Sequence, residues 1–481
     1  MLLKTPLALI AAFIFAAPSF ADDELRQLAG AMHVHSTFSS GSLDIEDLTS
    51  LAAKQGLEVL ILTDHDLVAM EYGLFPFRNL LKRREERPSV LRAGAETYLA
   101  EIRNLNQRQQ KVLLVPGVQS SPFYYWEGSP FRNNLNGMNY RKELLLIGMQ
   151  DARDYKHLPL LHRGLSVRYV LHYLPRTLIL AGVVGLSLVL CFQKGLLRLS
   201  GFTIGAFGLL LLVNHHPFQS SRFDPYHGDA GIAPYQEVID YVRSRGGMAF
   251  WSHPESRYSA AGTHIGSVTL KTPEYADALL KSSHYSGFAA LYGDTTTAEL
   301  PGGHWDRVLM EYCLGKRSHP VWAIAESDFH GSKGEDPLNT FQTVFCVKEK
   351  STAAVLEALA KGRIYAVRKN RIGPKLVLDN FTVATIDGRR KASTGAEIEI
   401  DGSPVLSVEI ISSDNVSHAV VVEIIKNGKC WKRMKTKTPV RQRFPDLAPE
   451  PGRSFYRLAA KSAACGRLLS NPIFVTVKNP G

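Results

Sequence analysis

Histidine and aspartate side chains recur along this 481-residue chain in a pattern that suits metal binding. His33 and His35 are two residues apart, and such residues share one face of a β-strand, so both imidazoles can reach a single ion. Imidazole and carboxylate groups together are typical ligands of zinc, manganese and iron. The further candidates along the chain are Asp44, His65, His253, Asp328 and His330.

The whole set is larger than one ion requires. Five histidines and two aspartates predict a site for two or three ions. Paired ions activate a water molecule and stabilise both the attacking and the leaving oxygen, so the expected chemistry is hydrolysis. Any one of these residues alone is equally explained as an ordinary core or surface residue, and only the ordered set carries the prediction.

Short apolar runs precede most of these residues and are predicted to be buried parallel strands. Amphipathic stretches that suit helices separate most of the runs, and this repeat indicates a β/α barrel. In such barrels the groups at the carboxyl ends of the strands form the active site. The runs lie at residues 31–35, 59–63, 112–118, 144–148, 248–252, 288–291 and 321–325.

The order of the motifs resembles that of the polymerase and histidinol phosphatase (PHP) superfamily. The motifs are HxH at 33–35, a nearby aspartate, TDH at 63–65, PGV at 116–118, SHP at 252–254 and DxH at 328–330. The resemblance covers about residues 28–370 and implies an α/β fold, a distorted (β/α)7 barrel that holds two or three metal ions. The C-terminal part, with its Ser-Asn-Pro-Ile segment at 470–473, resembles the carbaryl-hydrolase-like branch of that superfamily.

The same resemblance implies a set of ligands for each ion. The first set is His33, His35 and Asp328, the second is Asp44, His65 and His330, and His253 matches a ligand of a third position.

Two departures from the family pattern affect the third position. The family has a bridging glutamate after Pro-Gly-Val, where this chain has Gln119, and the run at 144–148 lacks a histidine. Gln119 is retained as a candidate ligand, although an amide is a poorer bridge than a carboxylate. We therefore expect two divalent ions (Zn, Mn or Fe). His253 and Asp66 are the candidates for proton transfer, and Arg257 is the candidate for holding an anionic substrate.

The expected function is that of a phosphoesterase that uses a metal-activated water. Hydrolysis of a carbamate, ester or amide is the alternative within enzymes, and a non-catalytic sensor or scaffold is the alternative outside them. A measurement of bound metal would distinguish the non-catalytic sensor or scaffold from the two kinds of hydrolase. The net charge of +11 suits an anionic small-molecule substrate, but the basic residues are dispersed without a nucleic-acid motif, so no nucleic-acid partner is expected. The oligomeric state stays open.

The N-terminus predicts export. Lys4, an apolar run at 7–17 and a small-x-small end at 19–21 describe a signal peptide over residues 1–21, with an uncleaved anchor as the alternative. Two uncharged runs within 177–213 predict a transmembrane helical hairpin inserted in the barrel, with two buried core helices as the alternative. We expect a membrane-anchored protein whose catalytic region faces the periplasm and whose hairpin tip, at Lys194, lies in the cytoplasm.

The composition changes after about residue 371. Alternating β-type runs with turn signals predict a β-sandwich domain over residues 373–481. The five cysteines contain no CxxC zinc pattern. An oxidising compartment would permit a disulfide between Cys430 and Cys465, while Cys313 and Cys346 are either paired or buried thiols. The sequence leaves these alternatives open.

Overall fold

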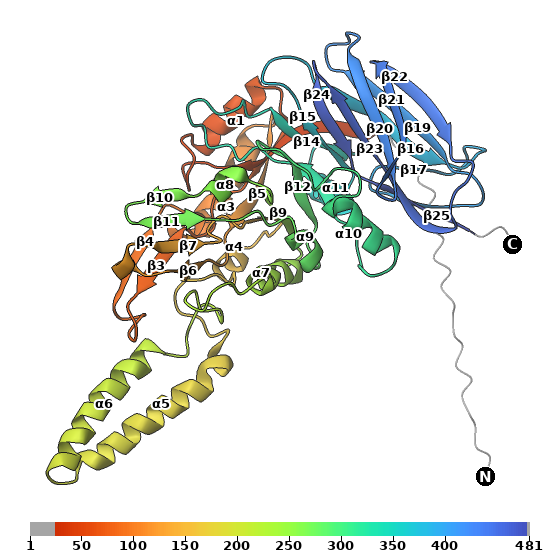
Figure 1. Cartoon of the computed structure of the whole chain (residues 1–481). Coiled ribbons are helices and arrows are strands. Elements are labelled where there is room, and N and C mark those ends of the chain that lie inside the picture. The colour runs from red at the N-terminus through yellow and green to blue at the C-terminus, as the bar shows by residue number, and fades with distance from the viewer. Residues whose placement is uncertain (1–24, 479–481) are drawn as a thin grey trace, which may run out of the picture.

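The chain forms a mixed α/β region, a strand-rich C-terminal region and a helical hairpin that stands away from both (Figure 1). The computed structural model describes residues 25–478. The predicted signal peptide at residues 1–21 lies outside the described residues.

The seven apolar runs that were predicted to be strands all form strands of one sheet. Alternate residues of a strand point to opposite faces, and both faces are covered, since Leu60 and Leu62 belong to one hydrophobic cluster and Val59 and Ile61 to another. The strands are β1 (Arg26–Val34), β2 (Val59–Leu62), β5 (Leu113–Ser120), β8 (Leu144–Ile147), β9 (Met248–Trp251), β12 (Gly287–Leu291) and β13 (Trp322–Ala325).

One of these strands runs in the opposite direction to the prediction. β8 pairs antiparallel with both β5 and β9, whereas the other neighbouring pairs among the seven strands are parallel. The segment between β5 and β8 contains two short strands, β6 (Tyr125–Glu127) and β7 (Leu135–Met138), and no α-helix. A parallel neighbour needs a long crossover, usually helical, and an antiparallel neighbour does not. The amino end of β8 therefore lies beside the carboxyl ends of the other strands.

The predicted closed barrel is not found among the described strands. The strand order ends at β13, and β1 pairs on its other side with β14 (Phe341–Val347). Side chains occupy the free edge of β13, because the Thr343 hydroxyl bonds both the N–H and the C=O of Ala325, and Asn471 bonds the same strand near its start. The segment after β13 forms no strand with β1. One isolated bridge, between Val34 and Phe329, and a few backbone hydrogen bonds from residues 327–329 join the two segments.

Helices pack around this sheet through apolar faces, as their amphipathic patterns predict. α1, for example, buries Ile45, Leu48, Thr49 and Ala52. The longer helices are α1 (Ile45–Lys54), α3 (Ala95–Arg108), α7 (Ala233–Ser244), α10 (His304–Cys313) and α11 (Thr352–Lys361). The short ones are α2 (Val90–Ala93), α4 (Ala152–Lys156), α8 (Arg257–Ala261) and α9 (Ala278–Lys281). A ribbon of β3 (Ala69–Gly73) and β4 (Lys82–Glu86) and a small sheet of β10 (Thr263–Ile265), β11 (Val268–Lys271), β7 and β6 lie beside the main sheet.

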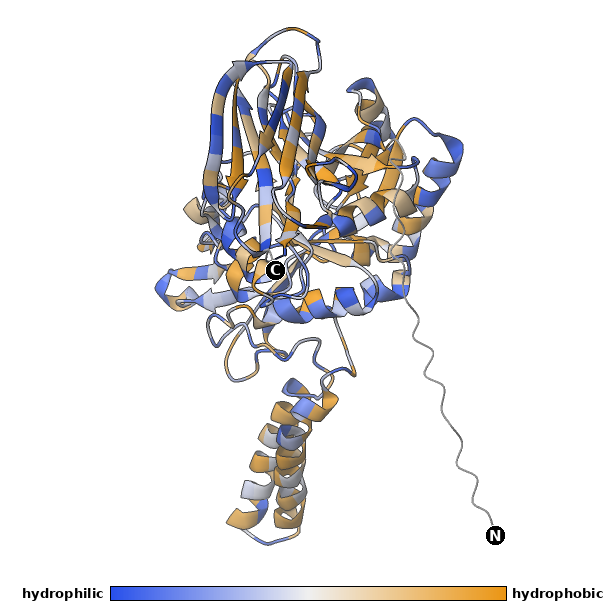
Figure 2. Ribbon diagram, turned by 90° about the vertical axis from the view of Figure 1, so that its right-hand side faces the viewer, coloured by the Kyte–Doolittle hydropathy of each residue, from blue (hydrophilic) through white to orange (hydrophobic). Residues whose placement is uncertain are grey.

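The hairpin consists of α5 (Val170–Cys191) and α6 (Leu196–Asn214), inserted between β8 and β9. Both helices are long and apolar enough to cross a membrane, and only 6% and 11% of their most apolar windows is buried. Figure 2 shows the pair projecting from the body with apolar residues on its outer surface. The alternative of two buried core helices therefore does not describe this hairpin.

Two sheets form the C-terminal region around a shared hydrophobic core. One consists of β16 (Leu376–Ala384), β17 (Lys391–Ser393), β19 (Val405–Ser412) and β22 (Val440–Pro445). The other continues the main sheet through β14, β15 (Ile364–Arg368), β24 (Gly466–Ser470), β23 (Gly452–Ser462), β20 (Ala419–Lys426) and β21 (Lys429–Lys437). β25 (Ile473–Val477) also pairs with β23, and β18 (Glu397–Ile400) pairs with β25. All five cysteines are free thiols, including Cys430 and Cys465.

Candidate metal centre

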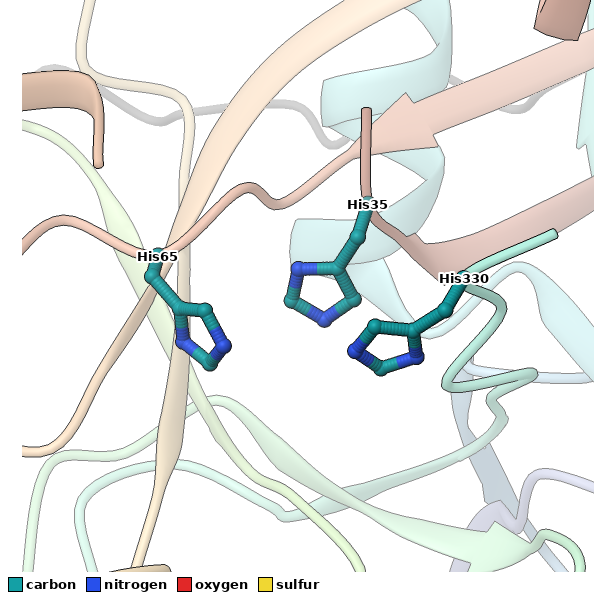
Figure 3. A group of neighbouring side chains, drawn as sticks. All are labelled: His35, His65 and His330. Atoms are coloured by element: carbon teal, nitrogen blue, oxygen red, sulfur yellow. The ribbon is translucent and has the colours of Figure 1, made fainter. Parts of the chain in front are cut away.

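Three histidines from separate segments converge at the carboxyl edge of the sheet. His35 follows β1, His65 follows β2, and His330 follows β13, and their rings turn toward one another (Figure 3). The ring of His35 lies 4.7 Å from that of His65 and 4.2 Å from that of His330, between centroids. One ligand atom from each lies within 4.8 Å of the others. We call these three residues the histidine group.

A second cluster of donors lies beside the first. One ligand atom each from His33, His253 and Asp328 also fall within 4.8 Å of one another, and we call these residues the mixed group. All three have positive φ angles, of 63°, 21° and 47°. Such backbone is costly for residues other than glycine, and it concentrates at functional sites where the surroundings enforce it. The backbone is thus held in the conformation that aims these side chains inward.

Asp328, a member of the mixed group, also contacts the histidine group. Its Oδ1 atom is 3.3 Å from His33 Nε2 and 3.5 Å from His35 Nε2. The sequence predicted His33, His35 and Asp328 as one ligand set, whereas the compact groups pair His35 with His65 and His33 with His253. The set implied by the resemblance is compatible with these distances, because one carboxylate oxygen lies within 3.5 Å of both imidazoles. The carboxylate of Asp328 can serve both groups.

His33, His35 and His253 each have one ring nitrogen that contacts a supporting side chain and another that makes no hydrogen bond. His33 Nδ1 lies 3.1 Å from Glu326 Oε2, His35 Nδ1 lies 3.3 Å from Ser39 Oγ, and His253 Nε2 lies 3.0 Å from Glu143 Oε2. The opposite nitrogens, Nε2 of His33 and His35 and Nδ1 of His253, are buried without a hydrogen-bond partner. Buried polar atoms are rarely left unpaired, and metal-binding histidines have this arrangement of one oriented nitrogen and one free. These residues therefore fit a divalent metal ion.

Two buried carboxylates support the ligands from behind. Glu326 accepts hydrogen bonds from the backbone N–H of His253 at 2.7 Å and from the Ser252 hydroxyl at 2.9 Å, in addition to its contact with His33. Asp64 accepts a hydrogen bond from Ser39 Oγ at 2.6 Å, and that serine contacts His35. Each carboxylate thus fixes the orientation of a candidate ligand.

Burial sets the protonation of His35 and His65, two members of the histidine group. It lowers the pKa of His35 to about 3, and it lowers the pKa of His65 well below its ordinary value. Both rings are therefore neutral near pH 7, which is the form that binds metal.

Sequence reasoning missed Glu143, which lies directly before β8. The prediction looked for a histidine within the run at 144–148, but the strand is antiparallel, so the residue at its amino end reaches the site. Burial disfavours charge on both partners, yet the hydrogen bond and the attraction between them prevail. They raise the pKa of His253 to about 10 and lower the pKa of Glu143. An acidic residue immediately before an apolar run was the available signal.

A cavity of about 70 Å³ opens onto both groups. This is smaller than the roughly 300–1,000 Å³ of typical small-molecule sites, so it suits the reacting group of a substrate rather than a whole molecule. Arg141 contributes to its lining. Within residues 25–478, its guanidinium carbon lies 5.1 Å from the centre of the Tyr258 ring, and no ion pair with a carboxylate is found for it. The lining residues are His65, Leu67, Val68, Ala69, Gln119, Ser121, Tyr124, Tyr140, Arg141, Glu143, His253, Asp328 and His330.

The other predicted site residues lie in different surroundings. Gln119 lines the cavity with a buried, unpartnered Oε1 atom. Asp66 is buried next to His65, and burial raises its pKa to about 7, but it does not line the cavity. Asp44 caps α1 by accepting a hydrogen bond from Asp47 N–H and belongs to neither group. Arg257 is 68% exposed, lies 3.9 Å from Asp294 and is not part of the cavity wall.

Two solved structures and one family model are similar to this chain. Among solved structures, a two-domain protein from Bacteroides vulgatus ATCC 8482 that contains a predicted PHP-like metal-dependent phosphoesterase is 14% identical, with 91% of each chain covered and a TM-score of 0.36. A protein from Bifidobacterium adolescentis ATCC 15703 that is predicted to be a metal-dependent phosphoesterase is 14% identical, covering 64% of this chain and 89% of its own, with a TM-score of 0.27. The curated proteins contain no significant match. Residues 31–244 match the family model of the PHP domain.

Proposed function

We propose that this protein is a metal-dependent phosphoesterase with two divalent ions, one in each group. The observation that carries the proposal is the pair of three-donor groups that meet at Asp328 Oδ1. Zn, Mn and Fe suit donors of this kind. Bound there, the ions would supply Lewis acidity and an activated water for hydrolysis.

The substrate anion would be bound by Arg141. Its guanidinium is part of the cavity wall and has no carboxylate partner among the described residues, so its charge is available to a phosphate. A guanidinium matches two phosphate oxygens at once. Gln119 Oε1 faces the same space and can accept a hydrogen bond from a protonated oxygen of the substrate. Arg141 therefore takes the role that the sequence predicted for Arg257.

Glu143 keeps the proton of His253 on Nε2. With Nε2–H donating to the carboxylate, Nδ1 is the nitrogen on the side of the mixed group, and an ion bound there would displace the proton that the raised pKa of His253 retains near pH 7. This supports His253 as a ligand, with Glu143 as the residue that positions it. Asp66, whose carboxyl has a pKa of about 7 owing to burial, remains the candidate for proton transfer near neutral pH.

Metal stripping and reconstitution test this proposal. The full chain would be purified in detergent, treated with a chelator, reloaded with Mn²⁺ or Zn²⁺, and assayed on phosphomonoesters, phosphodiesters, carbamates and esters. We expect two ions per chain and metal-dependent release of phosphate. Fewer than one ion per chain after reloading would contradict the proposal and favour a scaffold. Preference for carbamates would instead favour the carbaryl-hydrolase-like reading.

We also propose that the hairpin at residues 177–213 spans a bilayer, with the catalytic and C-terminal regions on the exported side. α5 has 22 residues and α6 has 19. At about 1.5 Å per residue each is roughly as long as the ~30 Å hydrocarbon core. A Cβ at Gly205 would approach Ser187 Oγ to 2.7 Å, so the helices pack through small residues, as membrane helices do.

Reporter fusions test the topology. A reporter that is active only outside the cytoplasm would be placed after residue 481, and a second at Lys194 in the tip. We expect activity at the C-terminus and none at the tip. Recovery of the untagged protein in the soluble fraction without detergent would contradict the membrane hairpin.

A further inference from the structure

A second and larger cavity, of about 670 Å³, lies where the hairpin joins the body. Apolar side chains of the helices, among them Leu180, Phe207 and Leu211, line its hairpin side. Two arginines also line it, Arg78 from the loop between β3 and β4 and Arg176 from α5, and His215, which follows α6, lies beside them. We call this cavity the hairpin-base cavity. It combines an apolar wall with a group of cationic side chains at the same end of the two helices.

Arg78 lacks the partner that a cavity-lining arginine usually has. Its guanidinium lies 3.9 Å from the ring centre of Tyr226 and 5.7 Å from that of Phe75. Its Nε atom is buried without a hydrogen-bond partner, and no carboxylate contacts it within residues 25–478. Aromatic rings stabilise the cation but leave its N–H groups free. These donors are available to an anion.

Arg176 supplies a second cation to the cavity. Its Nη2 atom lies 2.8 Å from His215 Nε2, and no ion pair with a carboxylate is found for it in the described part of the chain. Burial, followed by the charge of Arg176, lowers the pKa of His215, so the neutral ring accepts this hydrogen bond. The remaining guanidinium donors of Arg176 are free.

The carboxylates of the cavity do not balance these charges. Glu71 is engaged by Lys82, Arg84 and His162. Asp224 pairs with its own neighbour on the loop, since its Oδ2 lies 2.8 Å from a ring nitrogen of the histidine three residues on. Glu71 is therefore balanced by its own cations, and the one other carboxylate in the lining, Asp224, is outnumbered by Arg78 and Arg176, so the cavity keeps an excess of positive charge.

The loop between β3 and β4 lies against the base of the hairpin. The backbone N–H of Asn79 donates to Asn214 Oδ1 at 2.8 Å, and its side chain bonds the backbone C=O of Asn214 at the same distance. The ring of Phe77 packs edge-on against Phe207 of α6, 5.4 Å between centroids. Phe75, at the tip of this loop, is 82% exposed. The loop thus adds apolar surface beside the helices, at the level of the cavity.

We propose that the hairpin-base cavity binds the phosphate head group of an anionic membrane lipid, which Arg78 and Arg176 hold while an acyl chain lies along α5 and α6. The apolar wall continues onto helices whose outer surface is apolar, and the cationic end is where a bilayer would end and water begin. The proposal rests on the membrane hairpin proposed above, and it is independent of the phosphoesterase activity.

This site is distinct from the candidate metal centre. Tyr124 lines the smaller cavity, and its hydroxyl lies 2.8 Å from His162 Nε2, which lines the hairpin-base cavity. The same hydroxyl accepts a hydrogen bond from the backbone N–H of Glu71 at 2.7 Å. The Tyr124, His162 and Glu71 contacts form the wall between the two cavities.

Thermal unfolding of the full chain in detergent, with defined lipids added, tests the proposal. The probes are phosphatidylglycerol, phosphatidylcholine and inorganic phosphate at matched concentrations. The Arg78→Gln/Arg176→Gln double variant is compared with an Arg83→Gln/Arg389→Gln control, because both control arginines are highly exposed and each pairs with a single carboxylate. Should the double variant not fold, the Arg78→Gln single variant is used, with bound lipid counted by native mass spectrometry.

We expect phosphatidylglycerol to raise the Tm of the wild type and of the control by several degrees more than phosphatidylcholine does. The double variant should lose most of this shift. An undiminished shift in the double variant, or equal shifts with the two lipids, would overturn the proposal. A full shift with inorganic phosphate alone would overturn the lipid in favour of a soluble anion.

Membrane fractionation of the same variants separates two kinds of failure. A wild type that is soluble without detergent would overturn both the hairpin and this site. A double variant that stays in the membrane and keeps the full lipid response would overturn the head-group site alone. Metal-dependent phosphate release, measured in parallel, is expected to be unchanged in the double variant.

Discussion

His253 Nε2 lies 3.0 Å from Glu143 Oε2, and both side chains are almost fully buried. Strands β8 and β9 are antiparallel neighbours. The contact therefore joins the residue just before β8 to the segment just after β9. A carboxylate that orients a metal-binding imidazole influences the ion without touching it. Several expected outcomes follow from this relationship and from the two ligand groups.

Glu143→Gln should weaken the centre while leaving the fold intact. The amide keeps the size of the side chain but removes the charge that favours the Nε2–H tautomer of His253. We expect metal affinity or kcat/KM to fall about 10–100-fold, as for other residues that orient ligands. Metal titration and steady-state kinetics measure both. Glu299→Gln, a buried carboxylate paired with Arg467 in another part of the chain, is the matched control and should change neither.

The two groups should lose metal separately. His65→Ala removes a member of the histidine group, and His253→Ala removes a member of the mixed group. Each variant should bind about one ion in place of two, whereas Asp328→Ala should reduce both. Elemental analysis of reconstituted protein gives the count. His264→Ala, in an exposed strand, should keep the full number. A normal count in both single variants would contradict the grouping.

Arg141 and Arg257 should differ in their effect on substrate binding. Arg141→Ala removes a charged donor from the cavity wall, and charge-assisted hydrogen bonds contribute about 1.5–3 kcal/mol, so KM for a phosphoester should rise roughly 10–100-fold. Arg257→Ala, at an exposed position beside Asp294, should change KM by less than about twofold. Asp328→Asn should abolish most of kcat. Equal small losses in the three variants would contradict the site.

Gly201 should be essential for hairpin packing. A Cβ there would lie 2.6 Å from the backbone N of Cys191, so Gly201→Leu must push α6 away from α5. We expect a lower Tm in detergent and faster proteolysis of the tip at residues 192–195. Gly182→Leu, where nothing lies within 4 Å of the added Cβ, is the matched control on the other helix. Equal behaviour of the two variants would contradict the observed packing.

Lys375 should make stability depend on pH. Burial, followed by repulsion from Lys369, lowers its pKa in the folded protein from 10.5 to about 8. Below pH 8 the buried charge destabilises the folded state in full, and the cost disappears as pH rises from about 8 to 10.5, because the folded state releases the proton first. Lys375→Met should therefore raise Tm, relative to wild type, more at pH 6.5 than at pH 9.5. The exposed Lys437→Met variant should show no such difference.

Strand positions could be predicted from the sequence because buried strands leave a continuous apolar run, as at residues 59–63. The direction of β8 could not, because direction depends on the connection before it, and the two short strands of that connection carried only weak signals. Glu143 was missed for the same reason. Gly-Val-Gln at 117–119 and Asp-x-His at 328–330 did lead to residues that line the cavity.

The role of Asp44 illustrates the limit of reading a residue type by itself. An aspartate directly before an amphipathic helix is also a common N-cap, and this second role is the one observed. Glu326 and Arg141 were missed, since supporting and cavity-lining roles depend on which distant segments meet. The sequence also could not predict that the barrel stays open at β13. The side chains of Thr343 and Asn471 bond the edge of that strand where a partner strand would otherwise pair.

The pairing of β15 with β24 makes the α/β region and the C-terminal strands parts of one cooperative unit. Arg457, fully buried in β23, reinforces the junction through a double hydrogen bond to Asp306 of α10. Cutting the chain near residue 373 would expose two bare strand edges, each a template for pairing with other chains. Calorimetry should accordingly record a single melting transition for the body, and neither half should be recoverable as a monodisperse fragment.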